Sequence, residues 1–148
     1  MKRIVLLDAG PLGLVTNPKL SPQSMACNQW LQSLLLDGVH ILVPEIADYE
    51  VRRELLRARK MKGMQRLDDL IEIVGYLPLT TAVMRDAAEL WAQVRQSGLP
   101  TADQHALDGD VILAAQARSI PADDVVVATT NVGHLARLVD AALWTDIV

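Results

Sequence analysis

The chain has 148 residues, of which 51% are hydrophobic and 22% charged, so we expect one globular domain over residues 1–148 and exclude a disordered chain. The formal net charge of −4 argues against a protein that coats nucleic acid through bulk charge, and the sequence has no apolar run long enough to cross a membrane. The single cysteine, Cys27, excludes a disulfide scaffold and a cysteine-rich zinc site, and it favours a reducing, cytoplasmic location.

The first half of the chain alternates apolar strand-like segments with amphipathic ones. In chain order we expect a buried strand over residues 2–8, a helix over 25–36, a strand over 39–43, a helix over 45–60 and a further helix through 68–73. A Gly-Pro turn is expected to end the first strand, and Gly63 to interrupt the chain between the last two helices.

The second half continues this alternation. In chain order we expect a short strand over residues 77–80, a helix over 82–96, a polar loop over 99–109, a helix over 110–119, a buried strand over 125–129, a short helix over 132–139 and an edge strand within 141–148. Strands that are continuously apolar and separated by helices predict an α/β fold with a mostly parallel sheet covered on both faces. In such sheets, functional groups gather where the strands end.

Acidic side chains recur at those positions: Asp8, then Glu45, Asp48 and Glu50, and finally Asp108 and Asp110. Each has an ordinary structural explanation, such as a turn, a helix dipole or an N-cap, although Glu50 lies deeper in its helix than a dipole requires. Asn131 equally suits a helix cap. Taken together, carboxylates that converge in one crevice repel each other, and a divalent cation with oxygen ligands relieves that repulsion.

The metal that fits these residues is Mg²⁺ or Mn²⁺, because the sequence has no Cys/His cluster for zinc. A carboxylate-bound ion of this kind activates water and neutralises charge on a phosphoryl oxygen. The acidic residues therefore point to a metal-dependent nuclease.

Four segments in order, IVLLDAGPLG, PEIADYEVRREL, LDGDVILAAQA and VVVATTNVGHLARL, resemble those of PIN-domain proteins of the VapC toxin type. This resemblance extends over nearly the whole chain. It implies a three-layer α/β/α sandwich with a central, mostly parallel sheet, and an Mg²⁺-dependent endoribonuclease. It also implies the toxin of a type II toxin–antitoxin pair, with RNA, a cognate antitoxin and a second copy of the chain as partners.

The resemblance also implies roles for individual residues. The catalytic positions it gives are Asp8, Glu50, Asp110 and Asn131. Asp8 and Asp110 are expected to hold the metal, while Glu50 completes the ligand set or orients water. Thr129 is expected to support the acids, and Asp108 is an extra acid that can join the metal shell.

Two departures from the family pattern leave a second interpretation open. Asn131 stands where many members carry an aspartate, and residues 9–10 are Ala-Gly where members often place a hydroxyl or amide side chain. The alternative function is therefore a catalytically weak or inactive PIN-like module that binds RNA or a protein partner.

Basic residues concentrate in the segment RRELLRARKMK, which contains Arg52, Arg53, Arg57, Arg59, Lys60 and Lys62. One interpretation is a solvated helix face with Glu54 in local ion pairs. The others are an edge that contacts RNA phosphates and a docking surface for an acidic or amphipathic partner segment. Arg52, Arg53 and Arg57 are the candidates for such binding.

Overall fold

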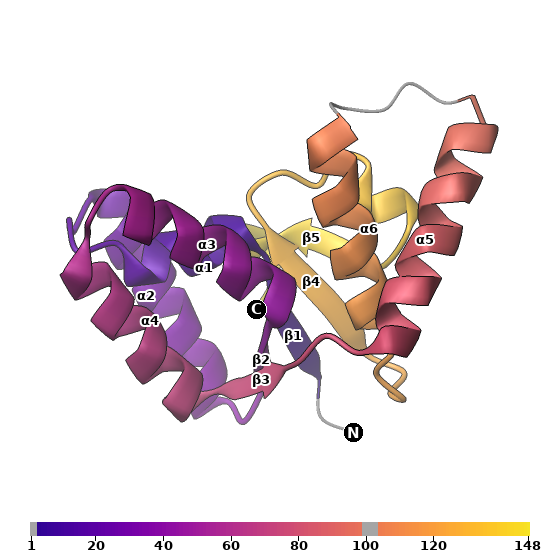
Figure 1. Cartoon of the computed structure of the whole chain (residues 1–148). Coiled ribbons are helices and arrows are strands. Elements are labelled where there is room, and N and C mark those ends of the chain that lie inside the picture. The colour runs from indigo at the N-terminus through magenta and orange to yellow at the C-terminus, as the bar shows by residue number, and fades with distance from the viewer. Residues whose placement is uncertain (1–2, 99–103) are drawn as a thin grey trace.

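The computed structural model describes residues 3–98 and 104–148, with the side chains of residues 104–106 excepted. A five-stranded sheet in the order β3-β2-β1-β4-β5 forms the centre of the molecule (Figure 1). Its strands are β1 (Ile4–Leu7), β2 (His40–Pro44), β3 (Gly75–Leu77), β4 (Val125–Thr129) and β5 (Ala141–Leu143). Every neighbouring pair is parallel, which confirms the sheet type predicted from the apolar strands.

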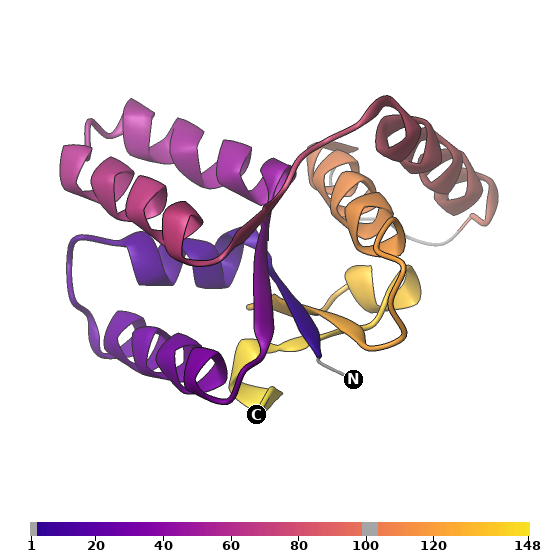
Figure 2. The same ribbon diagram turned by 90° about the horizontal axis from the view of Figure 1, so that it is seen from below.

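Helices cover both faces of this sheet. They are α1 (Ala9–Thr16), α2 (Pro22–Leu36), α3 (Glu45–Arg57), α4 (Met61–Ile73), α5 (Thr81–Gln96) and α6 (Gln104–Arg118), with short 3₁₀ turns η1 (Leu135–Arg137) and η2 (Trp144–Asp146). Helices α1 to α4 lie on one side, and α5 and α6 on the other (Figure 2). The chain therefore has the predicted three-layer α/β/α arrangement. Within the described ranges, no helix combines the length and apolarity needed to span a bilayer.

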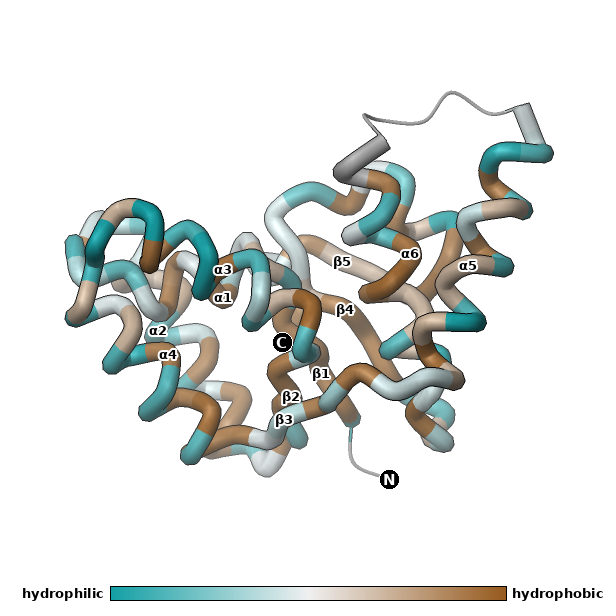
Figure 3. Tube along the Cα trace, viewed as in Figure 1, coloured by the Kyte–Doolittle hydropathy of each residue, from teal (hydrophilic) through white to brown (hydrophobic). Residues whose placement is uncertain are grey.

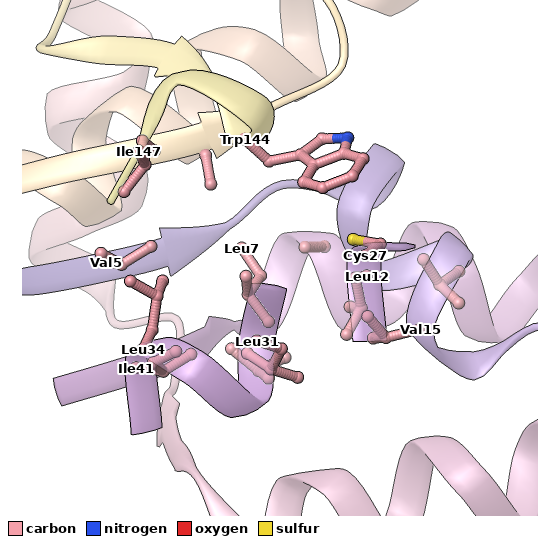
Figure 4. Close-up of a cluster of buried hydrophobic side chains, with 14 of the residues drawn as sticks. Val5, Leu7, Leu12, Val15, Cys27, Leu31, Leu34, Ile41, Trp144 and Ile147 are labelled. Atoms are coloured by element: carbon pink, nitrogen blue, oxygen red, sulfur yellow. The ribbon is translucent and has the colours of Figure 1, made fainter. Parts of the chain in front are cut away.

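Successive residues of β1 supply two separate cores. Val5 and Leu7 pack with α1 to α4, whereas Leu6 packs with α5 and α6. The first core also contains Trp144 (Figure 4). Its ring centroid lies 5.6 Å from that of Trp30. Apolar residues concentrate along the strands, and hydrophilic residues along the outer faces of the helices (Figure 3).

Helix α1 was not expected, because the segment AGPLGLVT was predicted as a Gly-Pro turn. Asp8 favours a helix here because it serves as its N-cap. Its backbone is extended, with φ −67° and ψ 167°, and its carboxylate accepts a hydrogen bond from the Ala9 N–H. An N-cap of this kind satisfies a helix-terminal amide, and Pro11 is tolerated in the first turn because its missing N–H has no helical partner there.

The prediction that Gly63 interrupts the chain between two helices is wrong. This glycine lies buried inside α4. A Cβ at this position would lie 2.6 Å from a Leu55 methyl on α3. The glycine therefore permits close packing of α3 and α4, and this gain offsets its low helix propensity.

The predicted polar loop over 99–109 is also partly wrong, because α6 already begins at Gln104. Residues 99–103 lie outside the described residues. Asp108 and Asp110 both lie within the helix, so neither caps it as proposed from the sequence. The third strand in chain order, β3, spans 75–77 instead of 77–80.

Candidate active site

Three acidic residues from three elements meet near the carboxyl edge of the sheet. Asp8 follows β1, Glu50 lies in the second turn of α3 and Asp110 lies in the N-terminal half of α6. Burial raises the pKa of the Glu50 carboxyl, the charges of Asp8 and Asp110 raise it further, and Arg53 opposes them. Burial and then Asp8 raise the pKa of Asp110, whereas His134 lowers it. The structure therefore brings Asp8, Glu50 and Asp110 together as one like-charged cluster, named here the acidic cluster.

Asp8 is held at both of its carboxylate oxygens. The Ala9 N–H donates to Oδ1 over 2.7 Å, and the buried Thr129 hydroxyl donates to Oδ2 over 2.8 Å. The Asn131 N–H in turn donates to the Thr129 hydroxyl oxygen over 3.2 Å. These bonds orient Asp8 before anything binds, and they place Thr129 in the supporting position that the resemblance implies.

Glu50 lies against the backbone of α6 at Gly109, next to Asp110. A Cβ on Gly109 would lie 3.4 Å from Oε2 of Glu50, so the Glu50 carboxylate lies against the backbone immediately before Asp110. A Cβ at position 109 would meet this carboxylate in ordinary van der Waals contact. Sequence reasoning did not single out this approach of Glu50 to the motif LDGDV.

The structure does not connect Asn131 or Asp108 to the acidic cluster by hydrogen bonds. Among the described residues, no hydrogen bond joins the Asn131 side chain to the three carboxylates, and its Oδ1 faces Gly133. Asp108 is exposed and borders hollows between α6 and its neighbours α3 and α5. Because Asp108 precedes Asp110 by two positions on a helix, the two side chains point in different directions.

Two further acids of α3, which the sequence left as alternatives to Glu50, are bound by protein donors. Glu45 Oε1 accepts the Leu79 N–H over 2.7 Å. Asp48 accepts the Tyr76 hydroxyl over 2.8 Å and the Nε–H of Arg52 over 3.0 Å. The Glu50 carboxylate, by contrast, lies within range of the charges of Asp8 and Asp110.

The three candidate arginines differ in their surroundings. Arg52 forms ion pairs with Asp48 and Asp68, the latter over 2.9 Å. Arg57 pairs with Glu54 over 2.8 Å, as the solvated-face interpretation predicted. Arg53 is the one nearest the acidic cluster. Its guanidinium lies 4.0 Å from Oε2 of Glu50 and its Cζ lies 5.0 Å from the centroid of the Tyr49 ring.

Two other residues near the site escaped sequence reasoning. Gln116 is fully buried, accepting the Ile46 N–H over 3.2 Å and donating to the Leu77 carbonyl over 2.8 Å. It thereby connects α6 to the start of α3. The feature of the sequence that could have indicated this role is a single amide side chain within the apolar run VILAAQA. Thr130 fills the space beside Gly10, because a Cβ on that glycine would overlap the Thr130 hydroxyl. A hydroxyl therefore lies beside residues 9–10 even though neither carries one.

The donor chemistry of the acidic cluster fits Mg²⁺ or Mn²⁺. All of its side-chain donors are oxygens, and an ion bound there would offset the burial and the like-charge repulsion that raise the pKa values of Glu50 and Asp110. In the described part of the chain, no three His, Cys, Asp or Glu side chains form a ready-made metal-binding group. Mg²⁺ commonly binds through one or two carboxylates and retains water as its other ligands, so a site with Asp8 and Asp110 as its protein ligands would fit this ion.

A parallel sheet between two helical layers, with acids gathered at its carboxyl edge, is the architecture of a PIN-like domain. Solved structures with this fold match nearly the whole chain. VapBC2 from Rickettsia felis, bound to a DNA fragment from its promoter, matches with a TM-score of 0.71 and 17% identity over 95% of this chain and 98% of that chain. VapBC-1 from nontypeable Haemophilus influenzae matches with a TM-score of 0.64 and 19% identity over 97% and 99%. DNA-bound VapBC from Salmonella typhimurium matches with a TM-score of 0.67 and 17% identity, also over 97% and 99%.

These likenesses confirm the PIN-like fold predicted from the sequence. Neither a protein-family model nor a curated protein matches the chain. At identities below 20%, the solved structures establish the shared fold, and the activity has to be argued from the residues of this chain.

Proposed function

We propose that this protein is a metal-dependent endoribonuclease, the toxin of a type II toxin–antitoxin pair. The observation that carries the proposal is the acidic cluster, in which Asp8, Glu50 and Asp110 converge from three elements. Such a cluster opposes folding, and its chemistry is useful when a cation and a phosphodiester bind there. The shared fold with VapBC structures supports the assignment to a toxin.

In this proposal each acid has a separate task. Asp8 and Asp110 hold the divalent ion, which when bound lowers the pKa of water and stabilises negative charge on the phosphoryl group. Glu50 accepts a hydrogen bond from the attacking water at its carboxylate oxygen. Thr129 and the Ala9 N–H keep Asp8 in its orientation, so little reorganisation is needed when the ion and the RNA bind. Asn131 contributes a neutral amide near the open end of β4.

The partners follow from the same proposal. The structures with this fold are VapBC assemblies, which supports our inference of a cognate antitoxin for this chain. We infer a homodimer from the resemblance of the sequence to PIN-domain proteins, and a cytoplasmic location from the single cysteine. Pull-down of the product of a small neighbouring gene by the tagged full chain would test the antitoxin, and light scattering would test the dimer.

The decisive experiment is cleavage of a structured RNA by the purified chain, with Mg²⁺, with Mn²⁺ and with EDTA. Cleavage is expected with either metal and not with EDTA, and it should disappear in Asp8→Asn. Asp48→Asn, purified in parallel, is the matched control because Tyr76 and Arg52 occupy the carboxylate of this aspartate on the same helix. Equal cleavage by the wild type and Asp8→Asn would contradict the proposal and indicate a contaminating nuclease.

A binding module without catalysis is the second candidate function. Two observations favour it, namely the neutral Asn131 at a position where PIN-domain relatives often carry an acid, and the absence of a ready-made three-residue metal group in the described residues. Calorimetric titration with Mn²⁺ separates the two functions. Heat of binding that Asp110→Asn abolishes supports the nuclease, whereas no binding at millimolar Mn²⁺ supports the module.

A further inference from the structure

An aromatic side chain lies exposed directly beside the acidic cluster. Tyr49 precedes Glu50 on α3, and 56% of its surface is accessible. The Arg53 guanidinium lies over its ring at 5.0 Å, one helical turn further on, and is itself 55% exposed. More than half of the Tyr49 surface is in contact with solvent, and the flat faces of such a ring suit stacking with another planar group.

Tyr49 and Arg53 border a hollow of about 300 Å³ between α3 and α6. Ile46 and Ile112 form apolar walls, and Glu50 forms the side next to the acidic cluster. The hollow therefore opens beside the place where the proposed function positions a scissile phosphate. Its size accommodates one planar heterocycle together with part of a sugar.

Asp108 supplies the polar edge of this hollow. The side chain is exposed and makes no hydrogen bond or ion pair with another described residue. A carboxylate there repels phosphate but accepts hydrogen bonds from the edge of a base. Guanine presents two adjacent donors, N1–H and N2–H, that match both oxygens of one carboxylate, whereas uracil presents a single N–H between two carbonyls. Sequence-specific recognition of RNA uses such unstacked bases, held between planar side chains and read at their Watson–Crick edge.

We propose that Tyr49, Arg53 and Asp108 form a subsite for one unpaired nucleobase next to the acidic cluster, with guanine as the preferred base. This proposal rests on the ribonuclease function proposed above. Tyr49 stacks on the base, Arg53 extends the stack and offsets the surrounding negative charge, and Asp108 reads the base edge. The subsite requires a base that is free of pairing, so it directs cleavage to loops and single strands. Asp108 accordingly acts in base recognition instead of metal binding.

The test is an NMR titration of the full-length protein with GMP and with UMP in EDTA, observing the methyl groups of Ile46 and Ile112. EDTA prevents metal-dependent turnover, so binding is measured without catalysis. GMP is expected to shift these methyl signals at roughly tenfold lower concentration than UMP, the size of one good base-edge interaction. Tyr49→Leu should weaken GMP binding on the order of tenfold through lost stacking. Asp108→Asn should remove the preference for GMP.

Trp91→Leu is the matched control, because Arg95 lies over the Trp91 ring at 5.2 Å in the same spacing but on α5. It should leave both titrations unchanged. Equal binding of GMP and UMP by the wild type, or GMP binding that Tyr49→Leu does not alter, would overturn the subsite and leave the hollow to a protein segment. A loss that follows Trp91→Leu instead would place the base between α5 and α6 and would also overturn it. Failure of RNA cleavage with Mg²⁺ would overturn the proposed function separately, since the titration needs no metal.

Discussion

Helix α3 carries acidic side chains in two contrasting settings. In its first turn, Glu45 and Asp48 accept hydrogen bonds from Leu79, Tyr76 and Arg52 and so fasten the helix to its neighbours. Shortly afterwards Glu50 faces Asp8 and Asp110, and burial together with these charges raises its pKa. The first setting stabilises the fold and the second opposes it. Acids on one helix thus serve two purposes, and their hydrogen-bond partners show which purpose each serves.

The largest difference between the two settings should appear in activity. Asp8→Asn is expected to lower metal-dependent RNA cleavage by at least about a hundredfold, since changes even to groups behind a metal ligand cost ten- to a hundredfold. The fold should persist, because asparagine caps helices as well as aspartate does. Cleavage rates and circular dichroism of the variant beside Asp48→Asn check this. A comparable loss of cleavage in Asp48→Asn would remove the distinction between the settings.

The next effect concerns stability. Asp48→Ala leaves the Tyr76 hydroxyl and the Arg52 guanidinium without this acceptor, so we expect a loss of about 2 kcal/mol in the free energy of unfolding. Urea denaturation measures it. Glu50→Gln is the contrasting variant on the same helix and should not destabilise the protein in EDTA. Equal destabilisation by both substitutions would show that Glu50 has a structural role as well.

A smaller change in the free energy of unfolding, in this case a stabilisation, is expected on substitution of Asp110. Its pKa in the folded chain is raised, so the folded state binds the proton more tightly than the unfolded state, and stability is lost as the pH rises from about 4 through the raised value. Asp110→Asn removes this loss and should stabilise the metal-free protein at pH 7 by up to about 1 kcal/mol. Denaturation between pH 4 and 8 should show the difference vanish towards the acidic end.

Metal provides the control for this prediction. Under the proposed function, Mn²⁺ should bind the folded wild type and stabilise it by mass action, whereas the Asp110→Asn variant should gain little. A variant that is less stable than the wild type in EDTA at pH 7 would contradict the like-charge interpretation of the acidic cluster.

The smallest effect on stability is expected at Arg57. Its partner Glu54 and Arg57 itself are both exposed, so Arg57→Ala should leave the free energy of unfolding unchanged. If RNA phosphates contact it, the slope of log affinity against log salt concentration should fall by about 1. Arg52→Ala should show the reverse pattern, lower stability with an unchanged slope, because Asp48 and Asp68 occupy its guanidinium. An unchanged slope in Arg57→Ala would limit this arginine to its local ion pair.

What the sequence could predict depended on how local the determining interactions are. The strands β1 and β4 were predicted closely, because short runs of Val, Ile and Leu between turns suit only buried strands. Helix α1 was missed because its glycines and proline resemble a turn, and only the cap from Asp8 outweighs them. The early start of α6 was missed because its first half is mostly polar in sequence, and only contacts such as those of Leu107 and Val111 with the core that also contains Leu90 of α5 favour a helix there.

The acidic residues show the same limit. The resemblance to PIN-domain proteins implied Asp8, Glu50 and Asp110, and the structure brings these three together, while their catalytic roles stay predictions. The separation of Glu50 from Glu45 and Asp48 depended on Leu79 and Tyr76, which are distant in sequence. The direction in which the Asp108 side chain points likewise depended on α6 beginning earlier than expected. The spacing of residues within one segment predicts neither the distant hydrogen-bond partners nor the start of the helix.

Gln116 has a consequence for how the two helical layers move. Glu50 and Asp110 belong to helices on opposite sides of the sheet, and Gln116 joins those helices through the buried amide of Ile46. Any motion that opens the space between α3 and α6 must expose that amide to solvent. The hydrogen-exchange rate of the Ile46 amide therefore measures how often the two helical layers separate. An ion or nucleotide that holds both layers together should slow this exchange, while amides in α2, remote from the acids, keep their rates.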